Sequence, residues 1–138
     1  ARAGVLRWLK SKGKTDAESR YRAECKRVTT FVQLVLKTRA ALDELYQTNH
    51  PTETMREQKS VILKKLKDRL LSLHAEDPEY SGLARWAKRS INNANLAAIA
   101  VYYRHVPAFE LLLERNGGVL EKYFTEDTLS MQKLMEIF

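Results

Sequence analysis

Val28-Thr-Thr-Phe-Val-Gln-Leu-Val-Leu-Lys-Thr-Arg-Ala-Ala-Leu-Asp-Glu-Leu-Tyr46 is the stretch of sequence that decides the fold. Its apolar side chains recur at steps of three, four and seven residues, which is the spacing of one face of an α-helix. The helix is expected to begin at Thr15 and to run to Gln47. The residues of this apolar face are Val28, Phe31, Val32, Val35, Leu42, Leu45 and Tyr46.

A second apolar stripe follows the turn Thr48-Asn-His-Pro51. Pro51 suits the first position of a helix, because its missing N–H would have no partner there in any case. The same helical steps then connect Met55, Ile62, Leu66, Leu70 and Leu73. Two such helices joined by a short turn predict a long antiparallel helical hairpin over residues 15–74.

Shorter helices are expected on both sides of this hairpin. An amphipathic segment precedes it and ends near Lys12-Gly13, and Asp77-Pro78-Glu79 is a stop-and-restart signal after it. The later elements are expected to be a short helix or irregular segment with Trp86 as a core anchor, compact helices over Asn92–Arg104, Pro107–Arg115 and Val119–Phe124, and an amphipathic helix over Asp127–Phe138. The predicted fold class is all-α, with the hairpin packed against the shorter helices of residues 78–138. Residues 1–138 are expected to form a single helical domain, or a fragment from the C-terminal part of a larger protein.

Composition restricts the function only weakly. Lys and Arg exceed Asp and Glu to give a net charge of +7, which favours acidic partners without selecting nucleic acid, membrane or protein. Cys25 is the single cysteine, so an intrachain disulfide and a cysteine-based zinc cluster are both excluded. The longest apolar run, Asn95–Tyr103, is far shorter than the roughly 20 residues of a membrane-spanning helix, so no transmembrane segment is expected.

No complete catalytic motif is present in the sequence. The three histidines, His50, His74 and His105, are widely separated, and none belongs to an H-E-x-x-H motif of the kind that binds zinc in peptidases. Cys25 does not lie in a glycine-flanked turn, as a nucleophile at a strand-to-helix elbow would. The chain itself is therefore expected to hold no metal.

A run of basic residues in the second long helix offers a different kind of function. These cations flank the apolar stripe as a solvated helix face would, and no aromatic side chain is interleaved with them to stack on bases. Nucleic acid is therefore not the expected partner. The alternative function is a helical interaction module that binds an acidic protein or nucleic acid through a protruding basic hairpin. The cations are Lys59, Lys64, Lys65, Lys67 and Arg69.

The segment Ile91-Asn-Asn-Ala-Asn-Leu-Ala-Ala-Ile-Ala-Val-Tyr-Tyr-Arg-His-Val-Pro-Ala-Phe109 is the most informative for function. Asn92 or Asn93 is expected to cap a helix, and Pro107 to restart the chain after a turn. Small alanine side chains after the cap allow close approach of a neighbour. The paired asparagine amides either fix the loop or present hydrogen-bonding groups to a ligand.

The same segment resembles a bacterial family of predicted zinc-dependent aminopeptidases. The family's C-terminal region reads Leu-Asn-Asn-Ala-His-Leu, then Ala-Thr-Tyr, then Val-Pro-Ala-Phe. The corresponding residues here are Ile91 to Leu96, Ala100 to Tyr102, and Val106 to Phe109, and the order continues through Leu111–Leu113 and Gly117–Phe124. The chain departs from the family pattern at Asn95 and Tyr103, where the family has His.

The resemblance implies a function that the chain would perform only as part of a larger protein. Gly4-Val-Leu-Arg-Trp-Leu9 is similar to the segment that follows the family's metal-ligating Glu, which places the H-E-x-x-H helix before Ala1. The chain would then be the C-terminal helical part of a zinc-dependent aminopeptidase, shaping the peptide cleft and inactive alone. The resemblance also implies a location in the bacterial cell envelope or periplasm. Oligomeric state does not follow from it.

Three residues are the candidates for a site. In zinc peptidases a tyrosine away from the metal can donate a hydrogen bond to the oxyanion of the tetrahedral intermediate, and Tyr102 is the candidate for this role. Asn92 and Asn93 are the candidates for binding the backbone or the free amino group of the peptide. The alternative for Tyr102 is a packing role in the core.

Overall fold

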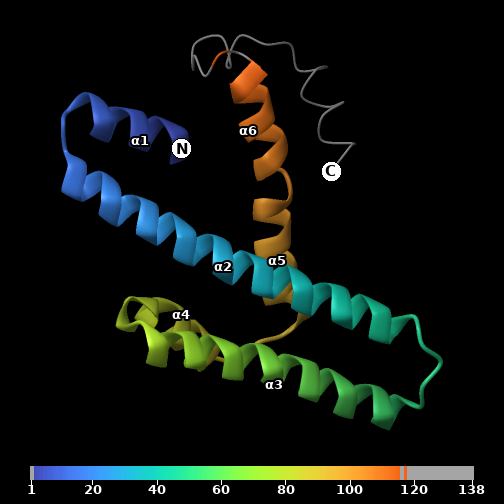
Figure 1. The fold of residues 1–138 in the computed structure, drawn as a ribbon. Helices are drawn as coiled ribbons and strands as arrows, with labels where there is room; N and C mark the ends of the chain where they lie inside the picture. Colours follow the sequence, from blue (N-terminus) through green and yellow to red (C-terminus); the bar gives the residue numbers. More distant parts are fainter. Residues whose placement is uncertain (1, 116, 118–138) are drawn as a thin grey trace. The chain divides into compact units, whose positions relative to one another are not determined.

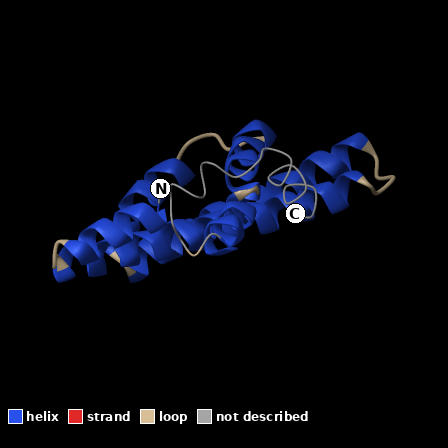
Figure 2. Cartoon of the chain, turned by 90° about the horizontal axis from the view of Figure 1, so that it is seen from above, coloured by secondary structure: helices blue, strands red, loops and turns tan. Residues whose placement is uncertain are grey.

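The computed structural model describes residues 2–115 and Gly117, and all regular structure in these residues is helical (Figures 1 and 2). The prediction of an all-α fold is confirmed for this part of the chain. The helices expected over Val119–Phe124 and Asp127–Phe138 lie outside the described residues. The elements are α1 (Arg2–Ser11), α2 (Thr15–Tyr46), α3 (Thr52–Glu76), the 3₁₀ helix η1 (Pro78–Tyr80), α4 (Ser81–Ala87), α5 (Asn93–Arg104) and α6 (Val106–Arg115).

The chain divides into two compact units. The terminal unit consists of Ala1–Glu18 and Val101–Phe138, and the central unit consists of Ser19–Ala100. Helices α2 and α5 therefore each have residues in both units. The expected single domain stays a prediction.

Helix α1 in the terminal unit ends where the sequence predicts. Gly13 has a φ of 62°, which is the left-handed conformation that glycine adopts without steric cost. The Gly13 N–H donates to the Lys10 carbonyl at 3.1 Å, and the Lys14 N–H donates to the Leu9 carbonyl at 3.1 Å. These two bonds form a Schellman motif, which satisfies carbonyl groups at the end of the helix.

Helices α2 and α3 of the predicted hairpin have nearly the expected bounds. Helix α2 has 32 residues, which corresponds to about 48 Å. Pro51 is the N-cap of α3 and not its first helical residue, because its carbonyl already accepts the Met55 N–H at 2.9 Å. The buried side chains on these helices coincide with the predicted stripes, and they are Phe31, Val32, Val35, Leu42, Leu45, Leu66, Leu70 and Leu73.

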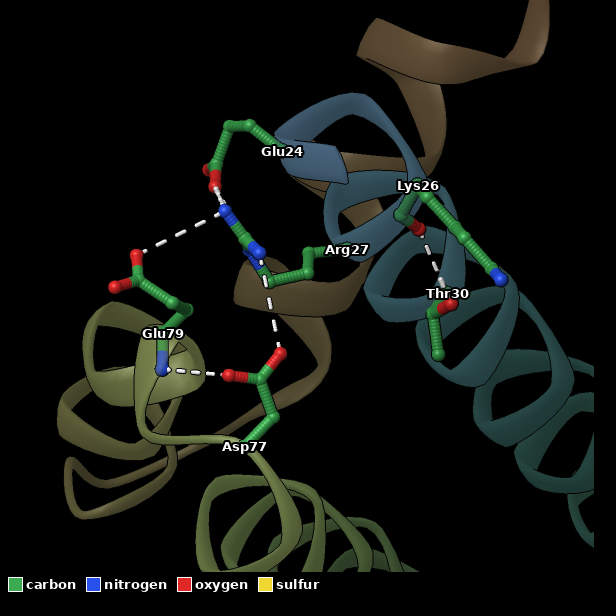
Figure 3. A network of polar contacts seen from close by, with 6 residues as sticks. All are labelled: Glu24, Lys26, Arg27, Thr30, Asp77 and Glu79. Carbon is green, nitrogen blue, oxygen red and sulfur yellow. Dashed lines mark hydrogen bonds and ion pairs between the residues drawn. The ribbon is translucent and has the colours of Figure 1, made fainter. Parts of the chain in front are cut away.

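Three tertiary contacts connect α2 to the part of the central unit that follows α3. The Arg27 guanidinium pairs with the carboxylates of Asp77 at 3.9 Å and Glu79 at 3.8 Å, as Figure 3 shows. One helical turn later, the Phe31 ring packs edge-on against the half-buried Trp86 of α4, with ring centroids 5.0 Å apart. The third contact joins Tyr46, at the end of α2, to Asn93 at the start of α5.

Arg27 is held by a third carboxylate on its own helix. Its Nε donates to Glu24 Oε2 at 2.9 Å, and its Nη2 lies 2.8 Å from the same oxygen. This hydrogen bond raises the pKa of the Arg27 guanidinium; partial desolvation acts in the opposite direction, and the negative charges of Glu24, Asp77 and Glu79 raise it further. Asp77 also accepts the Glu79 N–H at 3.0 Å and so caps η1. One aspartate therefore ends α3, begins η1 and contacts α2.

The order of the three contacts gives the direction of the chain in the central unit. Residues 77, 86 and 93 contact residues 27, 31 and 46 of α2 in the same order. Helix α3 begins six residues after Tyr46 and ends beside Asp77, so it returns in the direction opposite to α2 (Figure 1). Direct packing of α2 on α3 along a hairpin stays a prediction.

Helices α5 and α6 are separated by a single residue, His105. Pro107 has no N–H to donate to the helix turn before it, so the α5 ladder ends and α6 begins anew, with the Phe109 N–H donating to the His105 carbonyl at 3.1 Å. Helix α6 thus begins at Val106, one residue before the predicted start. Its side chains Ala108 and Leu112 are buried and pack with Leu111.

The stretch Asn93–Arg115 has the length and apolar composition of a membrane-spanning helix, and it is the one such stretch among the described residues. Composition alone is weak evidence, because core helices of other proteins pass the same test. The expected absence of a transmembrane segment stays a prediction.

Adjacent leucines on α3 provide a matched test of the core. Leu70 is fully buried, whereas 38% of the Leu71 surface is exposed. We expect Leu70→Ala to lower the free energy of unfolding by about 2–5 kcal/mol, because it removes buried methyl groups and leaves a cavity. Leu71→Ala should lower it by less than about 1 kcal/mol. Urea unfolding followed by far-UV circular dichroism measures both, and equal losses would contradict this assignment of the core.

Candidate functional site

The first turn of α5 is closed by two asparagines that bond to each other's backbone. The Asn92 N–H donates to Asn95 Oδ1 at 3.0 Å, and the Asn95 N–H donates to Asn92 Oδ1 at 3.0 Å. This reciprocal arrangement is a capping box, with Asn92 as the N-cap and Asn95 three residues later. The side chain of Asn92 thereby satisfies an N–H that the helix leaves unpaired at its start.

Asn95 had no role in the sequence prediction, although a signal for it was available. A polar residue three positions after an N-cap asparagine has capping-box spacing, and Asn95 stands there in place of the family's histidine. An amide oxygen can accept the N-cap N–H at that position. The departure from the family pattern is thus compatible with a well-closed helix start.

Asn93 is bound by the last residue of α2. Its Nδ2 donates to the Tyr46 hydroxyl oxygen at 2.9 Å, and that oxygen lies 3.3 Å from Asn93 Oδ1. Both side chains belong to the central unit and are exposed. The amide of Asn93 therefore already has a partner 47 positions away in the chain, and a peptide would compete with Tyr46 for it.

Tyr102 projects from the surface of the described structure. Its exposed fraction is 74%, so it is not a core residue of this part of the chain. The Tyr103 ring packs edge-on against it, with centroids 4.9 Å apart and planes at 70°. The Tyr102 ring thus has an aromatic neighbour on one side and remains largely exposed.

The three candidate residues fall in different units of the chain. Asn92, the N-cap of α5, and Asn93 belong to the central unit, whereas Tyr102 of the same helix belongs to the terminal unit. Their proposed roles stay predictions.

Metal ligands do not cluster in the described part of the chain. Among residues 2–115 and 117, no group of three His, Cys, Asp or Glu side chains could hold a metal ion. His74 and His105 each have a buried Nδ1 without a hydrogen-bond partner, but they belong to different units. The described residues thus do not fit a zinc site.

The basic run on α3 is partly neutralised by its own helix. Lys64 pairs with Asp68 at 3.1 Å, and Arg69 pairs with Glu76 at 3.1 Å. Pairing within a helix is typical of a solvated surface. It gives no specific support to the alternative of a nucleic-acid or acidic-protein interface on α3.

The chain is thus an all-helical protein in its described part, with an exposed tyrosine and a polar helix start as its candidate binding features. A family model described as "Putative aminopeptidase" matches residues 1–136. The chain belongs to this aminopeptidase family. No curated protein and no solved structure matches it.

The capping role of Asn92 leads to a stability prediction. We expect Asn92→Ala to lower the free energy of unfolding by about 0.5–2 kcal/mol, because the substitution removes the side-chain acceptor of the N-cap. Asn92→Ser keeps an acceptor and should lie within a few tenths of a kcal/mol of the unaltered chain. Urea unfolding of both variants measures the difference, and a loss of the same size with Ser would contradict a capping role.

Proposed function

We propose that this chain is the C-terminal helical part of a zinc-dependent aminopeptidase, and that it forms one wall of the peptide cleft. The match of the family model over residues 1–136 carries the proposal. Zinc, its ligands and the general base would come from a region that precedes Ala1, as the resemblance of Gly4–Leu9 to the segment after the family's ligating Glu indicates. The same resemblance favours the bacterial cell envelope or periplasm as the location.

Tyr102 is the residue of this chain that the proposal assigns to catalysis. A phenolic O–H can donate a hydrogen bond to the oxyanion that forms when water attacks the peptide carbonyl. Such a donor must be able to reach the substrate, and the 74% exposure of Tyr102 supports this. The edge-on contact with Tyr103 would limit the motion of the donor.

The proposal assigns Asn92 and Asn93 to binding the backbone or the free amino group of the peptide, although both side chains already have hydrogen-bond partners. Asn92 uses its Oδ1 to cap α5, and Asn93 is bonded to Tyr46. To bind the substrate's amino group, either side chain would have to use hydrogen-bonding atoms or lone pairs that these contacts do not occupy. An amide has two donor hydrogens and an acceptor oxygen, so such groups remain.

The proposal predicts that the isolated chain is inactive. Purified residues 1–138, supplied with zinc, should not hydrolyse an aminoacyl-p-nitroanilide above the rate of the buffer, since the described residues do not group metal ligands. Release of p-nitroaniline measures the rate. Hydrolysis by the chain that is abolished by a chelator would overturn the assignment of the metal site to another region.

Substitution of Tyr102 tests the oxyanion role in a protein that also contains the preceding region. We expect Tyr102→Phe to reduce kcat by about 10- to 1000-fold with little change in KM, because the lost hydrogen bond would act only in the transition state. Tyr103→Phe is the matched control and should change kcat by less than about threefold. An unchanged kcat in Tyr102→Phe would remove the tyrosine from the mechanism.

A further inference from the structure

The positive charge of the chain is concentrated at its start. Residues 1–15 contain five cations and no acidic residue, and the first carboxylate is that of Asp16. The chain as a whole has a net charge of +7, so removal of these five leaves only +2 on the other residues. The five cations are Arg2, Arg7, Lys10, Lys12 and Lys14.

Helix α1 carries three of these cations, Lys12 and Lys14 follow its end, and its apolar face is only partly covered. Leu9 is buried, with 7% of its surface exposed, and Leu6 is half-buried. Val5 and Trp8 lie one helical turn apart at the edge of the same face. Their exposed fractions are 38% and 52%. The exposed apolar edge of α1 therefore centres on an indole ring.

One of the cations adjoins this exposed edge. The Lys14 Nζ lies 5.2 Å from the centroid of the Trp8 ring, within the range of a cation–π contact. Arg7, Lys10 and Lys12 form no ion pair with any residue of the described ranges 2–115 and 117. Positive charge on and next to α1 is therefore available to an external anionic surface.

We propose that α1 docks on an anionic lipid surface, with Val5 and Trp8 entering the interfacial region and the surrounding Lys and Arg residues contacting lipid headgroups. An indole prefers the boundary between headgroups and acyl chains, and basic amphipathic helices bind there through apolar area plus electrostatic attraction. The concentration of the net charge in residues 1–15 selects an anionic surface over a neutral one. This proposal does not depend on the peptidase activity.

Vesicle binding of the whole 138-residue chain tests the proposal. The chain should sediment with vesicles of phosphatidylcholine and phosphatidylglycerol, and it should remain in solution with phosphatidylcholine alone. Binding should weaken as salt concentration rises, because salt screens charges at a surface. Absence of binding to the anionic vesicles, or equal binding to both kinds, would overturn the proposal.

Two charge-matched variants locate the binding surface. Lys10→Gln, Lys12→Gln and Lys14→Gln together should reduce the partition coefficient about a hundredfold, because each cation near an anionic membrane contributes about a fivefold factor. Lys59→Gln, Lys65→Gln and Lys67→Gln together remove the same charge from α3 and should change it by less than about threefold. Equal losses in the two variants would show attraction by net charge without docking of α1, and would overturn the proposal.

The indole provides a direct measurement of insertion. Brominated acyl chains should quench the fluorescence of Trp8, isolated as the difference between the unaltered chain and Trp8→Phe, since Trp86 packs against Phe31 in the central unit. Trp8→Gln should lose most vesicle binding while retaining the helical circular dichroism of the chain. Two results would overturn the proposal: an unquenched Trp8, or concentration-dependent dimerisation through Trp8 without lipid binding.

Discussion

The central unit depends on a single turn of α2, in which Arg27 and Phe31 contact the chain that follows α3. Arg27 reaches two carboxylates there, and Phe31 packs on Trp86. A side chain with five donors in a planar fork suits this position, because it can pair with Asp77 and Glu79 while remaining bonded to Glu24. The ion pairs orient the chain after α3 relative to α2, and the contact between Phe31 and Trp86 buries apolar surface. Near the end of α2, the exposed pair of Tyr46 and Asn93 adds another link to the later helices.

The boundaries of the helices could be predicted from the sequence because the signals that set them are local. Gly13 ends α1 by adopting a positive φ, Asp77 caps η1, and Pro107 interrupts the helical ladder between α5 and α6. Each effect acts within a few residues of its source. The starts of α3 and α6 were each wrong by a single residue, because the proline lies beside the first helical residue and not at it. The ends of α2 and α3 differ from the expected Gln47 and residue 74 by one and two residues.

The tertiary contacts could not be predicted in the same way. Arg27 and Asp77 are fifty residues apart, and the charges near Arg27 in sequence offer several equivalent partners. Which carboxylate it meets depends on the length of α3, which returns the chain to this point. The partner of Asn93 likewise depends on where α2 ends. The exposure of Tyr102 could not be predicted from the sequence either, because a tyrosine on an Ala-rich helix can lie in the core or at the surface.

The two proposals meet at α1 but rest on different residues. Membership of the aminopeptidase family over residues 1–136 supports the proposed function, and that proposal would join a metal-bearing region directly to α1. If both proposals hold, docking of α1 on an anionic surface would keep the catalytic part of the protein close to that surface. Tyr102 belongs to α5, whereas Lys10, Lys12 and Lys14 have no part in the oxyanion role. Loss of membrane attachment and loss of catalysis are therefore separable in one protein, and each can fail without the other.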